Sequence, residues 1–388
     1  MIPYGRQEIS QADIDAVVEV LRSDYITQGP VVPKFEKAVA DYTGAKYGIA
    51  VNSGTSALHI ACLSLDLGPG DILWTSPISF VASANCGRYC GSNIDFVDID
   101  PDTWNISVSS LKNKLVQARD KQCLPKIVVP VHLAGQPTIQ EEIWELAQEF
   151  GFRVLEDASH AIGASRKGER VGSCRWSDIT VFSFHPVKII TTGEGGMAMT
   201  NDEELAWRMG ILRTHGISRD SERMTKKPEG TWYYEQLELG MNYRMTDIQA
   251  ALGLTQLKRL DEFVERRNKI AKKYNEELSY LPLQLPTVLI DNYSSFHLYI
   301  VRIKINNARH SHSKVFRNLR ESGIGVNLHY IPIHLQPYYQ KLGFRTGLFK
   351  EAEKYAKDAI TLPLHPWLTD EQQSYIIKSF NVLINSNK

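Results

Sequence analysis

Short apolar runs alternate with amphipathic stretches between residues 45 and 200, and this alternation limits the possible folds more than any other feature of the sequence. A short apolar run bounded by turn residues is typical of a buried strand, and an amphipathic stretch is typical of a helix that covers a sheet. The pattern therefore predicts one large α/β domain with a mainly parallel sheet between helices. The predicted strands are 47–51, 72–75, 94–97, 126–130, 153–156, 179–183 and 196–200.

The clearest helix of this region is predicted to begin at Thr138. Thr138 and Glu141 have the spacing of a capping box, in which each side chain bonds the backbone N–H of the other residue. Apolar residues then recur on one helical face as far as Phe150. Another helix is expected over 57–65, directly after the first strand.

After about residue 250 the pattern changes to that of a smaller α+β domain. One long amphipathic helix is predicted over 257–278, with Arg267 as a charged exception on its apolar side. A division into a large domain with an N-terminal arm (1–255) and a small domain (256–388) follows. The further elements expected are a loop at 281–294, a strand at 296–303, a helix at 313–321, a strand at 326–330 and two C-terminal helices.

The charges of the chain balance, with 44 Lys and Arg against 44 Asp and Glu. A nucleic-acid binder normally carries a basic excess, so no nucleic-acid partner is expected. The N-terminus lacks the apolar core of a signal peptide, and the longest uncharged run is too polar for a membrane span, which indicates a cytoplasmic enzyme with no membrane partner. The cysteines lack the spacing of a zinc site, so we expect no metal and five reduced thiols in the core: Cys62, Cys86, Cys90, Cys123 and Cys174.

A possible anion site lies at 52–56, where Asn-Ser-Gly-Thr-Ser joins the first strand to an apolar helix. A helix N-terminus offers free N–H groups and a favourable dipole to a phosphate, and the hydroxyls add further donors. The alternative is an ordinary strand-to-helix turn with a Ser or Thr cap. The segment has neither the Lys of a P-loop nor the glycine spacing of a dinucleotide fingerprint, so it is neither of these sites.

Two ionisable residues follow buried strands further along the chain. Asp157 ends an apolar strand and should lie at the carboxyl edge of the sheet, although such a residue can also be a simple turn former. Lys188 lies among apolar residues just after a strand, and the alternative for it is a solvated loop position. Desolvation would lower the pKa of the lysine and free its amine to form a Schiff base.

Phe80 also follows a strand and could stack on a planar ring, or it could be a core aromatic. A phosphate cradle, a stacking aromatic, a strand-end Asp and a reactive Lys in this order fit one cofactor, pyridoxal 5′-phosphate (PLP). Lys188 would hold its aldehyde, and Asp157 would keep its pyridine nitrogen protonated so that the ring can accept electrons.

Seven segments of the chain resemble the DegT/DnrJ/EryC1/StrS sugar aminotransferase family. They are NSGTSALH, ISFVASAN, PVHLAGQP, EDASHAIGA, FSFHPVKIITTGEGG, MNYRMTDIQAALG and HYIPIH, and they span residues 52–334. The resemblance implies the PLP-dependent transferase fold type I, which is the aspartate-aminotransferase-like fold with a large mixed-sheet domain and a small α+β domain. It also implies a homodimer with active sites shared between the subunits.

The resemblance implies roles at the matching motif positions. Lys188 is the Schiff-base lysine and proton carrier, Asp157 pairs with the pyridine nitrogen, and His160 lies near the phenolic oxygen of the cofactor at a position often occupied by Gln. Asn242 is implied to reach the phosphate of the neighbouring subunit. The other implied contacts are Thr55, Ser56 and Ser183 with phosphate, Phe80 with the ring, and Thr27, Gln28, His185, His329 and Tyr330 with substrate. For His329 and Tyr330 a packed strand end is the alternative.

Within the family, the variants ISFVASAN, SHAIG, SFHPVK, RTHGI and HLY are similar to the branch that serves pseudaminic acid biosynthesis. That branch uses glutamate to aminate C4 of UDP-4-keto-6-deoxy-N-acetyl-L-altrosamine. An aminotransferase for another nucleotide-linked keto sugar or for a cyclitol is the alternative. A dehydratase of the same fold would have His in place of Lys188, and a non-enzymatic regulator would have lost Lys188 or Asp157, so the sequence disfavours both.

Overall fold

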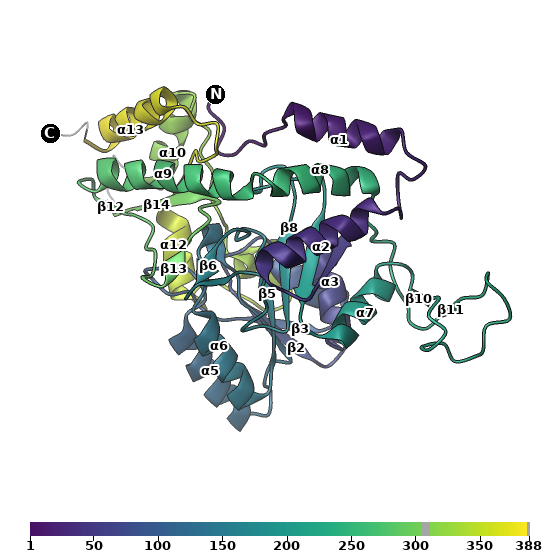
Figure 1. Cartoon of the computed structure of the whole chain (residues 1–388). Helices are drawn as coiled ribbons and strands as arrows, with labels where there is room; N and C mark the ends of the chain where they lie inside the picture. Colours follow the sequence, from purple (N-terminus) through teal and green to yellow (C-terminus); the bar gives the residue numbers. More distant parts are fainter. Residues whose placement is uncertain (305–310, 386–388) are drawn as a thin grey trace.

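A seven-stranded sheet forms the centre of the protein in the computed structural model, which describes residues 1–304 and 311–385 (Figure 1). The strand order is β1-β9-β8-β5-β4-β2-β3, and β9 runs in the direction opposite to that of the other six strands. All seven predicted strands are confirmed, with small shifts at the ends of three of them. Their bounds are β1 Tyr47–Val51, β2 Ile72–Thr75, β3 Asn93–Phe96, β4 Ile127–Val129, β5 Arg153–Asp157, β8 Ile179–Ser183 and β9 Gly196–Thr200.

Helices cover both faces of this sheet, which explains why its strands are apolar on both sides. One face packs against α3 (Gly54–Ser64), α4 (Ala82–Tyr89) and α7 (Glu203–Leu212). The other face packs against α2 (Val31–Thr43), α5 (Val108–Asp120), α6 (Gln140–Phe150) and α8 (Asp247–Leu257). The predicted α/β domain with a covered sheet is therefore confirmed.

The alternation of side chains along β5 separates two neighbouring carboxylates. Leu155 packs on the side of α3 and α4, whereas Val154 packs on the side of α5 and α6. Because side chains alternate along a strand, Asp157 lies on the face of Leu155 and Glu156 on the face of Val154. Glu156 is buried among Gln140, Thr180 and His132, away from the edge where Asp157 ends the strand.

A second, three-stranded sheet lies beside the first and has its own apolar cluster. Its strands are β12 (Leu283–Gln284), β14 (Tyr299–Ile303) and β15 (Ala359–Leu362), and its helices are α9 (Leu260–Leu278), α10 (His312–Glu321), α12 (Lys350–Asp358) and α13 (Asp370–Asn385). The start of α9 packs with the core around α2, and its later turns pack with the second sheet. The division at residues 255 and 256 stays a prediction, because α9 contributes to both clusters.

The long helix predicted over 257–278 is confirmed as α9, which begins three residues later at Leu260 because Leu257 ends α8. Two other local predictions are wrong. The capping box at Thr138 is absent: α6 begins at Gln140, the Thr138 N–H donates to His132 Nδ1, and Glu141 pairs with Arg166. Residues 326–330 form only a single bridge, from Asn327 to Thr361, because the hydroxyl of Tyr355 takes the carbonyl of His329 that the next rung of the ladder would need.

Two further predictions for the same half of the chain concern Arg267 and the C-terminal helices. Arg267 is buried on the apolar side of α9 as predicted, with 1% of its surface exposed. Its Nη1 donates to the carbonyls of Phe296, His297 and Leu364 at 3.3, 3.2 and 3.0 Å, whereas its buried Nε has no partner among the described residues. The C-terminal helices are confirmed as α12 and α13, but the intervening strand β15 was not predicted.

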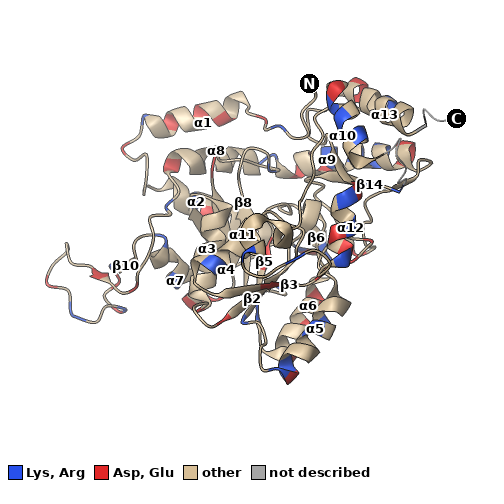
Figure 2. Cartoon of the chain, turned by 180° about the vertical axis from the view of Figure 1, so that it is seen from behind, with Lys and Arg blue, Asp and Glu red and all other residues tan. Residues whose placement is uncertain are grey.

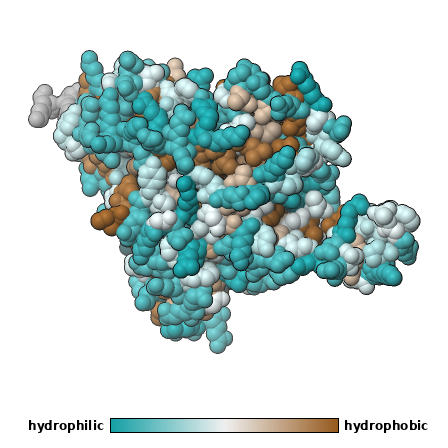
Figure 3. Space-filling view, in the orientation of Figure 1, coloured by the Kyte–Doolittle hydropathy of each residue, from teal (hydrophilic) through white to brown (hydrophobic). Residues whose placement is uncertain are grey.

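Two segments extend from the body of the molecule. Helix α1 (Gln11–Leu21) lies along α8 at one edge, and the chain around β10 (Ile217–Ser218) and β11 (Glu235–Gln236) projects outward (Figure 1). Both carry exposed apolar side chains, and hydrophobic residues gather around α1 and α8 in Figure 3. Acidic and basic residues are interspersed over the helices (Figure 2). Among the described residues, no helix is long and apolar enough to cross a membrane.

Candidate active site

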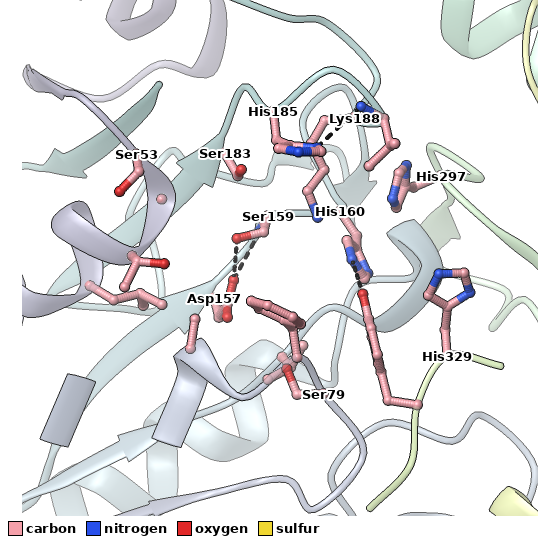
Figure 4. Close-up of a pocket in the computed structure, with 18 of the residues that line it drawn as sticks. Ser53, Ser79, Asp157, Ser159, His160, Ser183, His185, Lys188, His297 and His329 are labelled. Carbon is pink, nitrogen blue, oxygen red and sulfur yellow. Dashed lines mark hydrogen bonds between the residues drawn. The ribbon is translucent and has the colours of Figure 1, made fainter. Parts of the chain in front are cut away.

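A cavity of about 750 Å³ opens at the carboxyl edge of the large sheet. The parallel strands β2, β5 and β8 all end there, which is where α/β sheets place their ligands. Figure 4 shows side chains from these strand ends meeting in the cavity. Ten of the predicted site residues line it: Thr55, Ser56, Phe80, Asp157, His160, Ser183, His185, Lys188, His329 and Tyr330.

The segment 52–56 forms an anion cradle at the N-terminus of α3. Ser53 is the N-cap, since its Oγ accepts the N–H of Ser56 at 3.1 Å. The N–H groups of Gly54 and Thr55 have no partner among the described residues, and neither do the hydroxyls of Thr55 and Ser183. Backbone and hydroxyl donors therefore remain for a phosphate. The Ser56 hydroxyl already donates to Asn52 Oδ1 at 2.6 Å, so its phosphate contact stays a prediction.

Close backbone packing holds the cradle against β9. A Cβ placed on Gly196 would lie 2.4 Å from the carbonyl oxygen of Ser53 and 2.6 Å from the nitrogen of Gly54. We expect Gly196→Ala to push the cradle out of place and weaken PLP binding by about 10- to 100-fold, because overpacking costs about 1–3 kcal/mol. Titration of the apoprotein with PLP measures this affinity.

Gly210→Ala provides the matched control for this prediction. Gly210 lies inside α7, and a Cβ there meets nothing within 4 Å. This variant should bind PLP like the wild type and gain about 0.5–1 kcal/mol of stability. Equal PLP affinity in the two variants would contradict the role of Gly196.

Asp157 is held in one orientation by serines on both of its oxygens. Oδ1 accepts from the N–H and the hydroxyl of Ser159 at 3.1 and 2.6 Å, and Oδ2 accepts from the hydroxyl of Ser83 at 2.6 Å. Ser79 Oγ lies 2.6 Å from Ser83 Oγ and extends this chain of hydroxyls. The carboxylate is buried but still borders the cavity, so it can accept a hydrogen bond from a ligand nitrogen. Ser83 was not predicted, although it lies within the motif ISFVASAN.

Lys188 is the one lysine of the described residues that lines the cavity. Burial lowers the pKa of its amine from 10.5 to about 8, while the negative charge of Asp157 acts in the opposite direction. A considerable fraction of the lysine is therefore neutral near pH 7–8, as a nucleophilic amine requires.

This pKa predicts how PLP attaches to the apoprotein as the pH changes. Only the neutral amine attacks an aldehyde, so the attachment rate should rise with pH through about 8 and level off above it. Asp157→Asn should move the midpoint to lower pH, since the carboxylate favours the charged amine. Stopped-flow absorbance measures the rate, and a midpoint near 10.5 would contradict the effect of burial.

Phe80 is 58% exposed, and its exposed surface borders the cavity. Its ring centroid lies 6.2 Å from that of Tyr330. An aromatic ring that is open to a cavity suits stacking on a planar ligand, so the alternative of a core aromatic is wrong.

The histidines of the cavity differ in which nitrogens remain free. His160 accepts the N–H of Ala134 at Nδ1 and lies 3.1 Å from Tyr330 Oη at Nε2. His329 has both nitrogens engaged, Nδ1 with Thr361 Oγ1 at 2.8 Å and Nε2 with the Asn327 amide at 3.4 Å. The substrate contact of His329 therefore stays a prediction, since both ring nitrogens are already engaged in these contacts. His297 also lines the cavity and was missed as a site residue, although it begins the motif HLY.

Three predicted residues do not line the cavity of their own chain. Thr27 and Gln28 are exposed beside the start of α8, where the backbone of Thr27 bridges to Thr246. Asn242 is exposed at the base of the projecting segment, and its backbone bridges to Thr214. Direct contact of these residues with a ligand in the same chain is therefore not found.

The residues present fit PLP. The unpaired donors of the cradle suit its phosphate, Phe80 suits its ring, Asp157 can accept the pyridine N–H, and Lys188 can bind the aldehyde. When bound, PLP supplies an aldehyde and an electron-accepting ring. The Lys188 amine can then move a proton at the reacting carbon of the substrate as a positioned general base and acid. This fold and site define a PLP-dependent aminotransferase of fold type I.

The comparisons with known proteins agree with this class. Residues 7–381 match the model of the DegT/DnrJ/EryC1/StrS aminotransferase family, so the chain belongs to that family. A UDP-4-amino-4,6-dideoxy-N-acetyl-β-L-altrosamine transaminase from Campylobacter jejuni is 36% identical, over 94% of this chain and 93% of its own. The GDP-perosamine synthase of Caulobacter vibrioides is also 36% identical, over 95% of both chains.

Solved structures support both the fold and the cofactor. Spr1654 from Streptococcus pneumoniae in its PMP form superposes with a TM-score of 0.90 at 30% identity and covers 100% of both chains. The same protein is known in a PLP form. Helicobacter pylori PseC, an aminotransferase involved in the biosynthesis of pseudaminic acid, superposes with a TM-score of 0.89 at 32% identity over 99% of both chains. The predicted family, fold type, enzyme class and cofactor are therefore confirmed.

Proposed function

We propose that this aminotransferase moves the amino group of glutamate to C4 of a UDP-4-keto-6-deoxy-N-acetylhexosamine in pseudaminic acid biosynthesis. The observation that carries the proposal is that His160, His185 and His297 border one cavity. These histidines come from SHAIG, SFHPVK and HLY, the variants that are similar to the pseudaminic-acid branch. The likeness to the C. jejuni transaminase and to H. pylori PseC over nearly the whole chain supports the same substrate.

The size of the cavity is compatible with this reaction. A volume of about 750 Å³ lies within the range of about 300–1,000 Å³ that is usual for small-molecule sites. Its polar groups gather at the strand ends around Asp157 and Lys188, so the reacting carbon of a sugar would lie there. The nucleotide would then extend toward the opening of the cavity.

A panel of 4-keto sugars carrying UDP, dTDP or GDP, together with a keto cyclitol, tests the proposal. With glutamate present, mass spectrometry should show the amino product for the UDP-N-acetyl sugar with the highest kcat/KM. NMR of the product should place the amino group at C4. Amination at C3, or a higher kcat/KM for another acceptor, would contradict the proposed substrate.

An aminotransferase for another nucleotide-linked keto sugar is the second candidate. The GDP-perosamine synthase is as similar to this chain as the altrosamine transaminase, at 36% identity. Preference for the GDP sugar in the same panel would favour this candidate. The proposed use of glutamate is tested separately. For each mole of amino sugar formed, one mole of 2-oxoglutarate should be released from glutamate.

We also propose a homodimer in which each subunit completes the active site of the other. Thr27, Gln28 and Asn242 lie outside the cavity of their own chain but on or beside the two extended segments. The projecting segment exposes Trp232 and Leu239, at 72% and 80%, which a partner surface would cover.

Mixed dimers test the shared site. One chain carries Lys188→Ala and the other Asn242→Ala, with distinct tags for purification. If Asn242 serves the opposite site, one site of each mixed dimer carries both defects and the other carries none, so about half the activity should remain. If Asn242 serves its own chain, every site is defective and little activity should remain.

A cytoplasmic location completes the proposal. All five cysteines are free, and four of them are buried, which suits a compartment that keeps thiols reduced. Cell fractionation with an antibody tests this, and recovery in a secreted fraction would contradict it.

A further inference from the structure

One wall of the cavity is built from His160, His297 and Tyr330. His160 and His297 lie side by side in Figure 4, with ring centroids 4.4 Å apart. The Tyr330 ring is nearly parallel to that of His160, at an interplanar angle of 19° and a centroid distance of 6.1 Å. The hydrogen bonds of His160 and Tyr330, and the burial of His297, indicate which protons are free to donate to a ligand.

His160 is a neutral imidazole with its proton on Nε2. Its Nδ1 accepts the backbone N–H of Ala134 at 3.3 Å and so cannot carry a proton. Burial and the nearby charge of Lys188 hold the pKa of His160 well below its ordinary value, so the ring stays neutral. A neutral imidazole carries one proton, which leaves Nε2–H to donate to Tyr330 Oη at 3.1 Å.

The hydroxyl proton of Tyr330 must therefore point elsewhere. Burial raises the pKa of this phenol, so it remains protonated. His160 is its one hydrogen-bond partner among the described residues, and it acts as the donor of that bond. The Tyr330 O–H is left as a free donor, and the residue borders the cavity.

His297 offers another donor. The side chain is only 4% exposed, and its Nδ1 is fully buried with no partner among the described atoms. A buried N–H without an acceptor is rarer than a buried lone pair without a donor, so the proton belongs on Nε2. Burial, together with the charges of nearby groups, holds the pKa of His297 well below its ordinary value and keeps the ring neutral.

We propose that Tyr330 Oη–H and His297 Nε2–H form a donor pair for a substrate oxygen that is bonded to the reacting carbon or to the carbon next to it. The inference rests on the proposed function, since glutamate and a keto sugar both bring such an oxygen into this cavity. In glutamate it belongs to the α-carboxylate, and in the sugar it is the ketone oxygen. His160 acts here as a positioning residue, because its Nε2–H donates to Tyr330 Oη and leaves the phenol proton for the substrate.

Two probes distinguish the sources of the oxygen. Glutarate, a dicarboxylate without an amine, reports carboxylate binding to the PLP-loaded enzyme by calorimetry. The UDP-4-keto sugar reports ketone recognition through the single-turnover rate of the PMP-loaded enzyme. Tyr330→Phe and His297→Leu should each weaken glutarate binding or slow the sugar half-reaction by about 10-fold or more, because each removes a donor to a charged or partly charged oxygen.

Conservative variants distinguish the loss of a hydrogen-bond donor from the loss of side-chain packing. His297→Gln keeps an N–H near the position of Nε2 and should stay within about threefold of wild type, unlike His297→Leu. His160→Gln can still donate to Tyr330 and should likewise rescue the loss caused by His160→Leu. His365→Leu is the control, since His365 is a buried histidine that does not line the cavity. It should change neither probe.

An effect on glutarate places the carboxylate at the donor pair, and an effect on the sugar half-reaction alone places the ketone there. The proposal would be overturned if Tyr330→Phe and His297→Leu each changed both the glutarate affinity and the rate of the sugar half-reaction by less than twofold. It would also be overturned if His297→Gln and His297→Leu lowered glutarate affinity and the sugar half-reaction rate equally. The variants could weaken glutarate binding as expected although the wild-type enzyme does not aminate the UDP sugar. That result would support the donor pair and contradict only the proposed function.

Discussion

Replacing Lys188 with alanine is expected to slow amino transfer by at least about 10³-fold, through loss of both the nucleophile and the proton carrier. No other lysine of the described residues borders the cavity, so no neighbour can take its place. Borohydride reduction followed by mass spectrometry gives a readout that is independent of turnover. The wild-type chain should gain the mass of the cofactor at Lys188, and the variant should gain none.

Lys188→Arg is the matched variant for this experiment. Arginine keeps a positive charge near Asp157 but stays protonated and cannot attack an aldehyde. Lys188→Arg should lose cofactor attachment and amino transfer as Lys188→Ala does. That result would show that the enzyme needs the nucleophilic amine of Lys188 and not only its positive charge. Covalent attachment at another lysine, or substantial activity in either variant, would contradict the assignment of Lys188.

The Asp157→Asn variant is expected to have the next largest effect, a fall in kcat of about 10²–10³-fold. This is the range for losing one preorganised electrostatic partner. An amide has nearly the same shape as the carboxylate but no negative charge, so it cannot keep the pyridine nitrogen protonated. Ser83 and Ser159 would still orient the side chain, and the fold should persist. Rates of both half-reactions and the absorption spectrum of the bound cofactor measure the change.

Glu156→Gln is the control on the same strand. Glu156 is the adjacent residue, is equally buried, and faces α6 rather than the cavity. Its amide variant would disturb the contacts with Thr180 and Ser177 and cost about 1–3 kcal/mol of stability. Its cofactor spectrum should match the wild type. If Glu156→Gln changes that spectrum as much as Asp157→Asn does, the specific role of Asp157 is wrong.

The strands and the reactive residues at their ends were predictable because their signals are local. A buried strand needs a short apolar run, and β1, β2, β8 and β9 begin and end at the predicted residues. Asp157 and Lys188 stand out because charged groups rarely follow such runs without a partner or a purpose. The order of the cradle, Phe80, Asp157 and Lys188 along the chain was then enough to indicate PLP.

Local signals failed where a distant group competed for the same atoms. Thr138 and Glu141 have the spacing of a cap, but His132 takes the N–H of Thr138 and Arg166 takes the carboxylate of Glu141. Residues 326–330 were predicted to form a strand, but the hydroxyl of Tyr355 takes the carbonyl of His329 that a ladder with β15 would need.

The sequence by itself thus determined the alternation of strands and helices, the cofactor chemistry and the residues that bear it. Only the tertiary structure decided which of these residues meet, because β9 inserts between β1 and β8 and packs Gly196 against the cradle. It also brought His297, from just before β14, to within 4.4 Å of His160 at the edge of the large sheet. Apolar periodicity and turn residues act over a few neighbours, whereas the direction of a free proton depends on contacts between distant parts of the chain.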